Sequence, residues 1–207
     1  QLTFNAGSAR DAEIEKGLFG VANMAAQLMD EGTKRYKAEE IAAAFETTGA
    51  RFSATAYRDM FVVRLRTLSE PQKMQSAVKM MLEILKNSTF ERSNIQRVQS
   101  NTQIGQKQLQ ENPSRLMNIR LYRAIYGQHV YAEPITGTNA SIKRIQPAHL
   151  QQFRDQFLVA QNMNIAITFY TRGKSDIVAN HAIMGDITIN IGMKKFSNFN
   201  IGCQTSE

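Results

Sequence analysis

The chain has 207 residues, of which 43% are apolar and 21% charged, values typical of a globular protein with a substantial core. Its single cysteine, Cys203, excludes an internal disulfide framework and a cysteine-rich zinc site. The formal net charge of +7 comes from basic residues scattered along the sequence, without the dense basic run typical of a nucleic-acid-binding protein. No stretch approaches the ~20 apolar residues of a membrane-spanning helix.

The first third of the sequence predicts a strand, two helices and a hairpin. Residues 2–4 alternate between apolar and polar side chains, which predicts a half-buried strand. Apolar residues then recur at helical spacing over residues 17–31 and 38–48, and a glycine follows each predicted helix. Residues 51–57 and 61–65 alternate on either side of a short polar turn, which predicts a β-hairpin.

The rest of the sequence is predicted to be mostly helical. Four segments have helical period, namely residues 71–86, the polar and glutamine-rich 90–111, 116–125 and 147–158. The third has an apolar stripe of Leu116, Ile119, Tyr122 and Ile125. Residues 126–138 contain glycine and proline and predict a loop, and residues 164–170 predict a strand. Residues 187–199 carry only a weak strand or helix signal.

This order of elements predicts an α+β fold, with a mixed, largely antiparallel sheet and helices packed on one of its faces. We expect residues 1–170 to form this domain. Residues 171–207 fit the pattern poorly, and we expect them to pack on the same domain. The three histidines of the chain lie far apart in the sequence, so the sequence offers few ligands for a histidine-based metal site.

The most informative stretch is residues 20–33, which read Gly-Val-Ala-Asn-Met-Ala-Ala-Gln-Leu-Met-Asp-Glu-Gly-Thr. It resembles the part of the pitrilysin/insulinase family of zinc peptidases in which a helix carries H-x-x-E-H between a glycine and a Gly-Thr pair. In active members the two histidines bind zinc from one helical face, and the glutamate between them is the general base. By this resemblance the histidine positions fall on Asn23 and Gln27, and the glutamate position falls on Ala26.

These replacements imply that the chain is not catalytic. Amide side chains are weak, neutral zinc ligands, and alanine cannot take a proton from water. The third zinc ligand of the family is a glutamate on a later helix, expected here near Ile104 or Gly105, and neither side chain binds a metal. The resemblance therefore implies no catalytic residue, no metal site and no cofactor in this chain, although its catalytic relatives carry zinc.

Three more stretches carry the same resemblance. Residues 1–11 look like the first strand and following turn of the family, and residues 121–138 resemble the helix and loop that close its core. Residues 49–59 are similar to its edge strand, Gly-x-x-x-Asn-Ala-x-Thr-x-x-Asp. In the family this strand takes the substrate peptide as an added strand. The candidate peptide-binding residues are therefore Ser53, Ala54 and Thr55.

Two arginines of the hairpin are further candidates for substrate binding. Strand alternation places Arg64 and Arg66 on the face opposite Phe61, Val63 and Leu65, so both guanidinium groups should leave the core. The family has an arginine, in the half that lacks zinc, which holds the substrate beside the metal of the other half. The resemblance makes either residue a candidate for this role, and a solvated basic strand face is the alternative.

Three functions stay open at this point. The first is a non-catalytic homologue of a zinc metallopeptidase that supplies half of a chamber for unfolded peptide. Its partner would be a catalytic pitrilysin-like subunit or a second half of the same polypeptide. The second is a structural or assembly subunit without peptide binding, and the third is a zinc-dependent peptidase whose metal site lies outside this sequence. We expect no nucleic-acid partner and no membrane span, and family habit suggests the periplasm or cell envelope.

Overall fold

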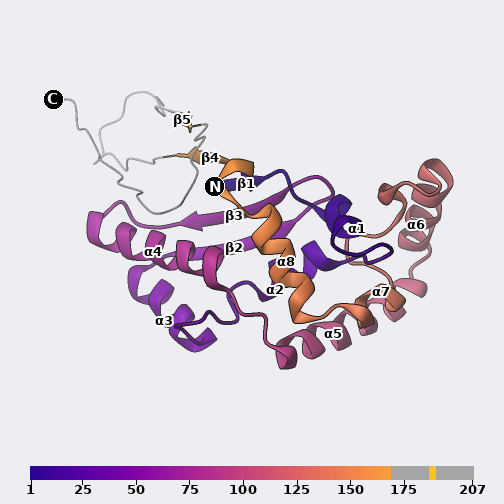
Figure 1. Ribbon diagram of the computed structural model, residues 1–207, viewed down its shortest axis with the longest axis horizontal. Coiled ribbons are helices and arrows are strands. Elements are labelled where there is room, and N and C mark those ends of the chain that lie inside the picture. The colour runs from indigo at the N-terminus through magenta and orange to yellow at the C-terminus, as the bar shows by residue number, and fades with distance from the viewer. Residues whose placement is uncertain (169–186, 190–207) are drawn as a thin grey trace, which may run out of the picture.

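Five strands form one sheet in the computed structural model, which describes residues 1–168 and 187–189 (Figure 1). The strands are β1 (Leu2–Phe4), β2 (Arg51–Ala56), β3 (Phe61–Arg66), β4 (Met163–Ile167) and β5 (Ile187–Ile189). Their order across the sheet is β2-β3-β1-β4-β5, so the first strand of the chain lies at the centre. All four pairings between these strands are antiparallel, which fits the predicted fold class.

Helices supply most of the remaining structure. They are α1 (Asp11–Ile14), α2 (Val21–Leu28), α3 (Ala38–Thr48), α4 (Pro71–Asn87), α5 (Arg92–Gln110), α6 (Pro113–Tyr126), α7 (Asn139–Arg144) and α8 (Pro147–Phe157). Short 3-10 turns are η1 (Ser8–Arg10), η2 (Val130–Ala132) and η3 (Ala160–Asn162). In the described part of the chain, none of the helices has the length and apolar character needed to cross a bilayer.

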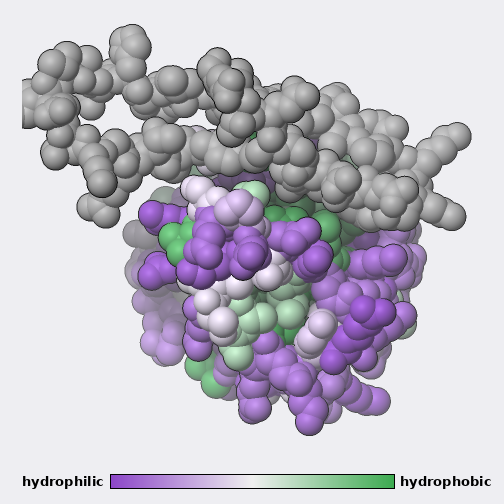
Figure 2. All heavy atoms as spheres, turned by 90° about the vertical axis from the view of Figure 1, so that its left-hand side faces the viewer, coloured by the Kyte–Doolittle hydropathy of each residue, from purple (hydrophilic) through white to green (hydrophobic). Residues whose placement is uncertain are grey.

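The molecule has two different ends. Figure 1 places α3 and α4 at one end and α6 and α7 at the other, with α2 and α8 between them. Figure 2 looks onto the α3–α4 end, where the surface is mostly hydrophilic, with small paler and apolar areas near its middle. Such a mixed surface is ordinary for a globular protein, because scattered exposed apolar residues need no partner.

Alternation along the strands separates a buried face of the sheet from an outer face. Phe4, Phe61 and Val63 are completely buried and face the helices. Phe61 contacts Phe153 of α8 with ring centroids 6.0 Å apart, a separation typical of favourable aromatic pairs. Burying each such side chain contributes about 1.5–3 kcal/mol, so this layer supplies much of the stability of the domain.

Among the helices, α2 and α7 differ from the sequence prediction, and the short α1 was not predicted. The helix predicted over residues 17–31 is the shorter α2, because Gly17 and Gly20 take positive φ values of 73° and 98° and interrupt helical geometry before Val21. The six residues of α7 lie next to the predicted loop and were not expected to be helical. They form a helix after Thr138, whose side-chain oxygen accepts a hydrogen bond from the backbone N–H of Ser141.

The C-terminal predictions are tested only in part. β4 ends at Ile167, so the last residues of the strand predicted over 164–170 lie outside the described part of the chain. The weak signal over residues 187–199 begins with the three residues of β5, which pair with β4. The packing expected for residues 171–207, including Cys203, otherwise falls outside the described residues and stays a prediction.

Candidate functional site

A carboxylate from an earlier turn fixes the start of α2. Asp11 is completely buried, and its two oxygens accept hydrogen bonds from the backbone N–H groups of Gly20 (2.7 Å), Val21 (3.2 Å) and Ala22 (2.9 Å). These N–H groups have no partner within the helix, and the positive end of the helix dipole favours an acceptor here. Burial raises the pKa of Asp11 to about 7, although the three hydrogen bonds act to lower it.

Two glycines bring the backbone of a distant loop against the same helix end. A Cβ atom on Gly137 would lie 2.2 Å from the carbonyl oxygen of Phe19, and the φ of Gly137 is +76°. A Cβ atom on Gly20 would lie 2.9 Å from the carbonyl oxygen of Thr136. Neither position has room for a side chain, so glycine is required where the loop before α7 meets the start of α2.

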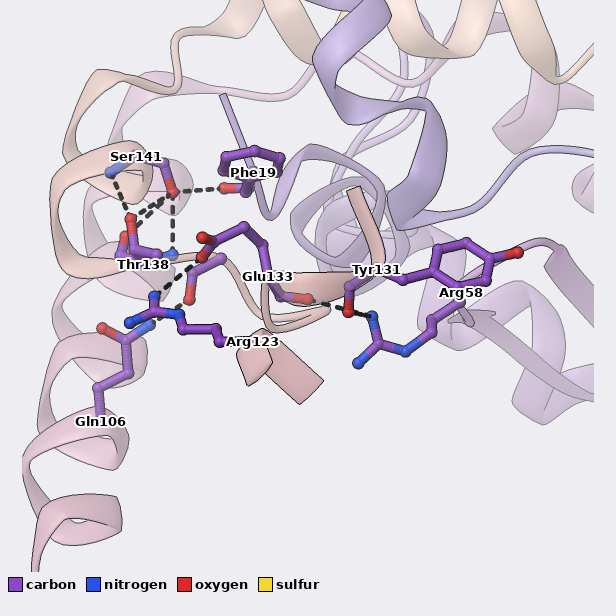
Figure 3. A network of polar contacts seen from close by, with 9 residues as sticks. Phe19, Arg58, Gln106, Arg123, Tyr131, Glu133, Thr138 and Ser141 are labelled. Carbon is purple, nitrogen blue, oxygen red and sulfur yellow. Dashed lines mark hydrogen bonds and ion pairs between the residues drawn. The ribbon is translucent and has the colours of Figure 1, made fainter. Parts of the chain in front are cut away.

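Polar side chains hold this loop in place (Figure 3). The side-chain amide of Gln106 on α5 donates to the carbonyl oxygen of Gly137 at 2.8 Å. The hydroxyl of Ser141 on α7 donates to the carbonyl oxygen of Phe19, also at 2.8 Å. The loop is thereby tied to α5 and to the segment that precedes α2.

An arginine from the β2–β3 turn ties the same loop to α6 (Figure 3). The guanidinium group of Arg58 donates to the carbonyl oxygens of Tyr131 (2.7 Å) and Glu133 (3.1 Å). It also lies 4.4 Å from the ring centroid of Tyr122, a cation–π geometry. Arg123 of α6 pairs with the carboxylate of Glu133 at 3.1 Å. These contacts hold the loop around the guanidinium group of Arg58, which comes from the β2–β3 turn.

The positions expected to carry zinc ligands lie on the outward side of α2. Asn23 is half-buried and Gln27 is exposed, whereas Ala26 is only 7% exposed. Four residues apart on a helix, Asn23 and Gln27 share one face, which is the geometry that two ligands would need. Over residues 1–168 and 187–189, no group of three or more His, Cys, Asp and Glu side chains is placed to hold a metal ion.

The expected third ligand position is on α5, which contacts α2. Ile104 is 57% exposed, and a Cβ atom on Gly105 would meet nothing within 4 Å. The two helices are joined at the surface by an ion pair between Arg97 of α5 and Glu31, just beyond α2, at 2.7 Å. The structure thus keeps α2 and α5 side by side, with apolar and amide groups at the three positions where the resemblance predicts ligands.

β2 is an edge strand, because among the described residues it pairs with β3 alone. The backbone N–H of Tyr57 donates to the carbonyl oxygen of Met60 at 2.8 Å, so these two residues form a hydrogen-bonded pair of the hairpin. Hydrogen-bonded residues alternate along an antiparallel pair. Ser53 and Thr55 therefore direct their backbone groups at β3, whereas Ala54 directs its N–H and carbonyl toward the open edge.

The candidate peptide-binding side chains divide between the two faces of the sheet. Ser53 lies directly opposite Arg64 on β3, and both are exposed on the outer face together with Arg66. Thr55 is on this face too, half-buried, whereas Ala54 points to the face that α2 covers. A strand added to β2 would alternate in the same way, so its side chains would meet the arginine side and the α2 side in turn.

Sequence reasoning missed the residues that position these elements. Asp11, Arg58 and Gln106 have partners 9, 73 and 31 residues away, farther than helical period or strand alternation can indicate. Only Asp11 has a usable signal, an acidic residue shortly before a glycine that opens a helix. The other two are ordinary polar residues in sequence.

Comparison with known proteins identifies the framework. The family described as Insulinase (Peptidase family M16) matches residues 1–139. An uncharacterized zinc protease of Rickettsia bellii (strain RML369-C) is 26% identical over 148 residues, which are 72% of this chain and 35% of that protein. The uncharacterized zinc protease YmxG of Bacillus subtilis (strain 168) is 20% identical over 148 residues, 72% of this chain and 36% of that protein. The chain thus spans about a third of the length of these relatives.

Solved structures agree with this match. The peptidase M16 inactive domain from Pseudomonas fluorescens has a TM-score of 0.74 and is 33% identical, covering 78% of this chain and 38% of that one. The periplasmic protease PqqL from Escherichia coli has the same fold, with a TM-score of 0.65 and 20% identity over 78% of this chain and 18% of that one. The resemblance found in the sequence is confirmed, and the chain belongs to the insulinase family of peptidases, M16.

Proposed function

We propose that this domain is a non-catalytic M16 peptidase homologue that binds an extended peptide along β2 and forms one wall of a chamber completed by a catalytic partner. The observation that carries the proposal is an M16 framework whose α2 has Asn23, Ala26 and Gln27 where the resemblance predicts the ligands and the base. The similarity to a Pseudomonas fluorescens domain described as inactive supports it. The partner we propose is an M16 domain that retains H-x-x-E-H, either as a separate subunit or in the same polypeptide.

The edge strand supports the peptide-binding part of the proposal. An added strand gains affinity from main-chain hydrogen bonds, which do not depend on the side chains of the edge. Ala54 offers its N–H and carbonyl at the open edge, and the exposed amide of Gln27 on α2 lies on the helix-covered side of the sheet. This arrangement suits binding without hydrolysis, because a backbone ladder needs neither metal nor base.

The loss of catalysis is tested on the purified protein by elemental analysis and by incubation with fluorogenic unstructured peptides. We expect no stoichiometric zinc and no cleavage, because amide groups replace imidazoles at both ligand positions. Stoichiometric zinc together with peptide cleavage would favour the reading as an active zinc peptidase and would end the proposal.

Peptide binding is tested by fluorescence anisotropy with labelled, unstructured 20-residue peptides. Ala54→Pro removes the outward N–H without touching the ladder to β3, a position where an edge strand tolerates proline. A lost hydrogen bond of about 0.5–1.5 kcal/mol corresponds to about 2- to 13-fold weaker binding. Ala54→Ser keeps the N–H and is the matched control. Absence of measurable binding by the unaltered protein would favour the structural or assembly role.

The ligand positions are tested by restoring them. Asn23→His with Gln27→His places two imidazoles one helical turn apart, and we expect the double variant to bind zinc at least about tenfold more tightly than Asn23→His alone. Competition with a zinc-sensitive dye measures both affinities. Equal affinities would mean that the two side chains do not converge, and that the framework of the metal site has changed along with its ligands.

A further inference from the structure

The outer face of the β2–β3 hairpin carries all the charged side chains of the five described strands. These are Arg51 on β2 and Arg64 and Arg66 on β3, and all three are exposed. The five strands contain no aspartate and no glutamate. Among the described residues, none of the three arginines takes part in an ion pair. The hairpin therefore presents positive charge without a carboxylate from its own sheet beside it.

Two of these arginines lie directly opposite each other. The register pairs Arg51 with Arg66, and like charges directly opposite on a sheet repel each other. The third is held toward β1, because the Nε of Arg64 donates to the side-chain oxygen of Gln1 at 3.1 Å. β1 lies on the side of β3 away from β2. Arg51 and Arg66 are thus the cations nearest the open edge of β2, and an anion bound there would relieve their repulsion.

A strand added at this edge would bring every second side chain beside Arg51, which is on β2 itself. On one face of an antiparallel pair, directly opposite side chains have Cβ atoms about 4.5–5.5 Å apart, and diagonal neighbours about 7–8 Å apart. The peptide residue opposite Arg51 is therefore in direct reach of its guanidinium group. The peptide residue opposite Ser53 is its diagonal neighbour, and the short Ser53 side chain leaves the space between them open.

We propose that the peptide bound along β2 is acidic, with carboxylates at alternate positions, and that Arg51 selects these side chains with Arg66 beside it. The inference rests on the proposed function and deepens it by naming the class of peptide. A guanidinium group matches a carboxylate with two parallel hydrogen bonds, which gives geometric selectivity as well as attraction. The main-chain bonds to Ala54 supply affinity for any extended peptide, and Arg51 distinguishes among peptides.

Other anionic partners fit the hairpin less well. A lipid surface is recognised by a cluster of about four to eight basic residues, and the two strands have three. Proteins that bind single-stranded nucleic acid combine positive charge with aromatic rings on which the bases stack. The aromatic residues of these strands, Phe52 and Phe61, are on the opposite face, which the helices cover. Alternate carboxylates on an added strand match both the charge and the spacing.

The test compares three labelled 20-residue peptides by fluorescence anisotropy. The first has glutamate at six alternate positions, with alanine and threonine elsewhere, and the second has glutamine at the same six positions. The third has the composition of the first with its glutamates in adjacent pairs, so only half of them can lie on one face of a strand. An exposed ion pair strengthens binding by about 1.4- to 5-fold. We expect the first peptide to bind at least about threefold more tightly than the second, and the third to fall between them.

Variants assign this preference to Arg51. Arg51→Gln should reduce the preference for glutamate over glutamine to less than about 1.5-fold. Arg120→Gln is the matched control, because it removes the same charge from an exposed side chain on α6, at the end of the molecule opposite α3 (Figure 1). It should keep the preference. Arg51→Glu places a carboxylate opposite Arg66, so the preference should disappear without a lower midpoint in urea denaturation.

The outcomes separate this inference from the proposed function. Equal binding of all three peptides that Ala54→Pro still weakens would overturn the inference and leave the proposed function standing. Binding of none of them would overturn both. Equal binding of the first and third peptides, or acidic binding that Ala54→Pro does not weaken, would mean that the arginines attract any anion without an added strand. A preference that survives Arg51→Gln would equally overturn the inference.

Discussion

The helices α2 and α6 belong to one domain but stand at opposite extremes of burial. Six of the eight residues of α2 are buried, and none of α6 is. α2 is fixed by Asp11 and by backbone packing at Gly20 and Gly137, none of which depends on a metal. The M16 framework around α2 is therefore held by contacts that need no metal, while α6, which buries none of its residues, contributes little to the fold.

The largest effect should come from the glycine that closes the contact with α2. Gly137→Ala would place a Cβ atom 2.2 Å from the Phe19 carbonyl oxygen at a φ of +76°, so the backbone must move. We expect a loss of at least about 4 kcal/mol in the free energy of unfolding. Gly105→Ala in α5 is the matched control, because its Cβ meets nothing within 4 Å and should stabilise the helix by about 0.5–1 kcal/mol. Urea denaturation measures both.

A pair of leucines tests the difference between the helices directly. Leu28 of α2 is completely buried, so Leu28→Ala should cost about 2–5 kcal/mol. Leu121 of α6 is 50% exposed, and Leu121→Ala should change stability by no more than about 0.5 kcal/mol. Urea denaturation measures the free energy of unfolding of both variants. Similar losses would mean that α6 stabilises the fold as much as α2 does, which would contradict the difference drawn between the two helices.

The attachment of α6 should depend on the hairpin turn. Arg58→Ala removes hydrogen bonds to the carbonyl groups of Tyr131 and Glu133 and the contact with Tyr122. Hydrogen bonds from charged groups contribute about 1.5–3 kcal/mol, so a loss in this range is expected. Limited proteolysis should then cut near α6 first. Arg58→Lys, which keeps the charge without the planar fork, should recover only part of the protection.

The last prediction is a pH dependence of stability at the start of α2. The pKa of Asp11 is raised by burial from its ordinary value of 3.8 to about 7 in the folded protein. Because the pKa is higher in the folded protein, the contribution of Asp11 to the free energy of unfolding is fully present below pH 3.8. This contribution is lost as the pH rises through about 7.

Relative to Asp11→Asn, which does not titrate, the free energy of unfolding should therefore decrease from pH 5 to 8, by at most about 1.4 kcal/mol per unit. Urea denaturation at four pH values measures the difference. The opposite slope would mean that the three backbone hydrogen bonds outweigh burial and hold the carboxyl ionised.

Local patterns predicted much of the fold, and longer-range contacts account for the rest. The β2–β3 hairpin and α4 follow from alternation and helical period, which need only neighbouring residues. The predicted α6 stripe is split in the structure, since Leu116 and Ile119 face the domain while Ile125 is exposed. Helical period identifies an apolar side, but it does not say whether the domain or another molecule covers that side.

The sequence predicted which residues belong to the candidate site, but not how these residues are arranged in space. The resemblance predicts ligand positions at Asn23 and Gln27 from the order of motifs along the chain. It also predicts the edge strand, which the structure shows as β2. Alternation along each strand already placed Ala54 on the apolar face and Arg64 on the opposite face, but the cross-strand pairing of Ser53 with Arg64 depends on the hairpin register. Strand register is set by side-chain packing and turn geometry together, and a single sequence shows only part of each.

The central place of β1 has a consequence for biosynthesis. Thr3 pairs with Val62 on one side and with Asn164 on the other, so β1 leaves the ribosome well before the strand that completes its pairing. Until β4 arrives, the nascent chain exposes an unpaired edge of β1, a template for association with other chains. Contacts so distant in sequence also close slowly. The half-synthesised domain, rather than the finished one, is therefore the species that most needs a chaperone.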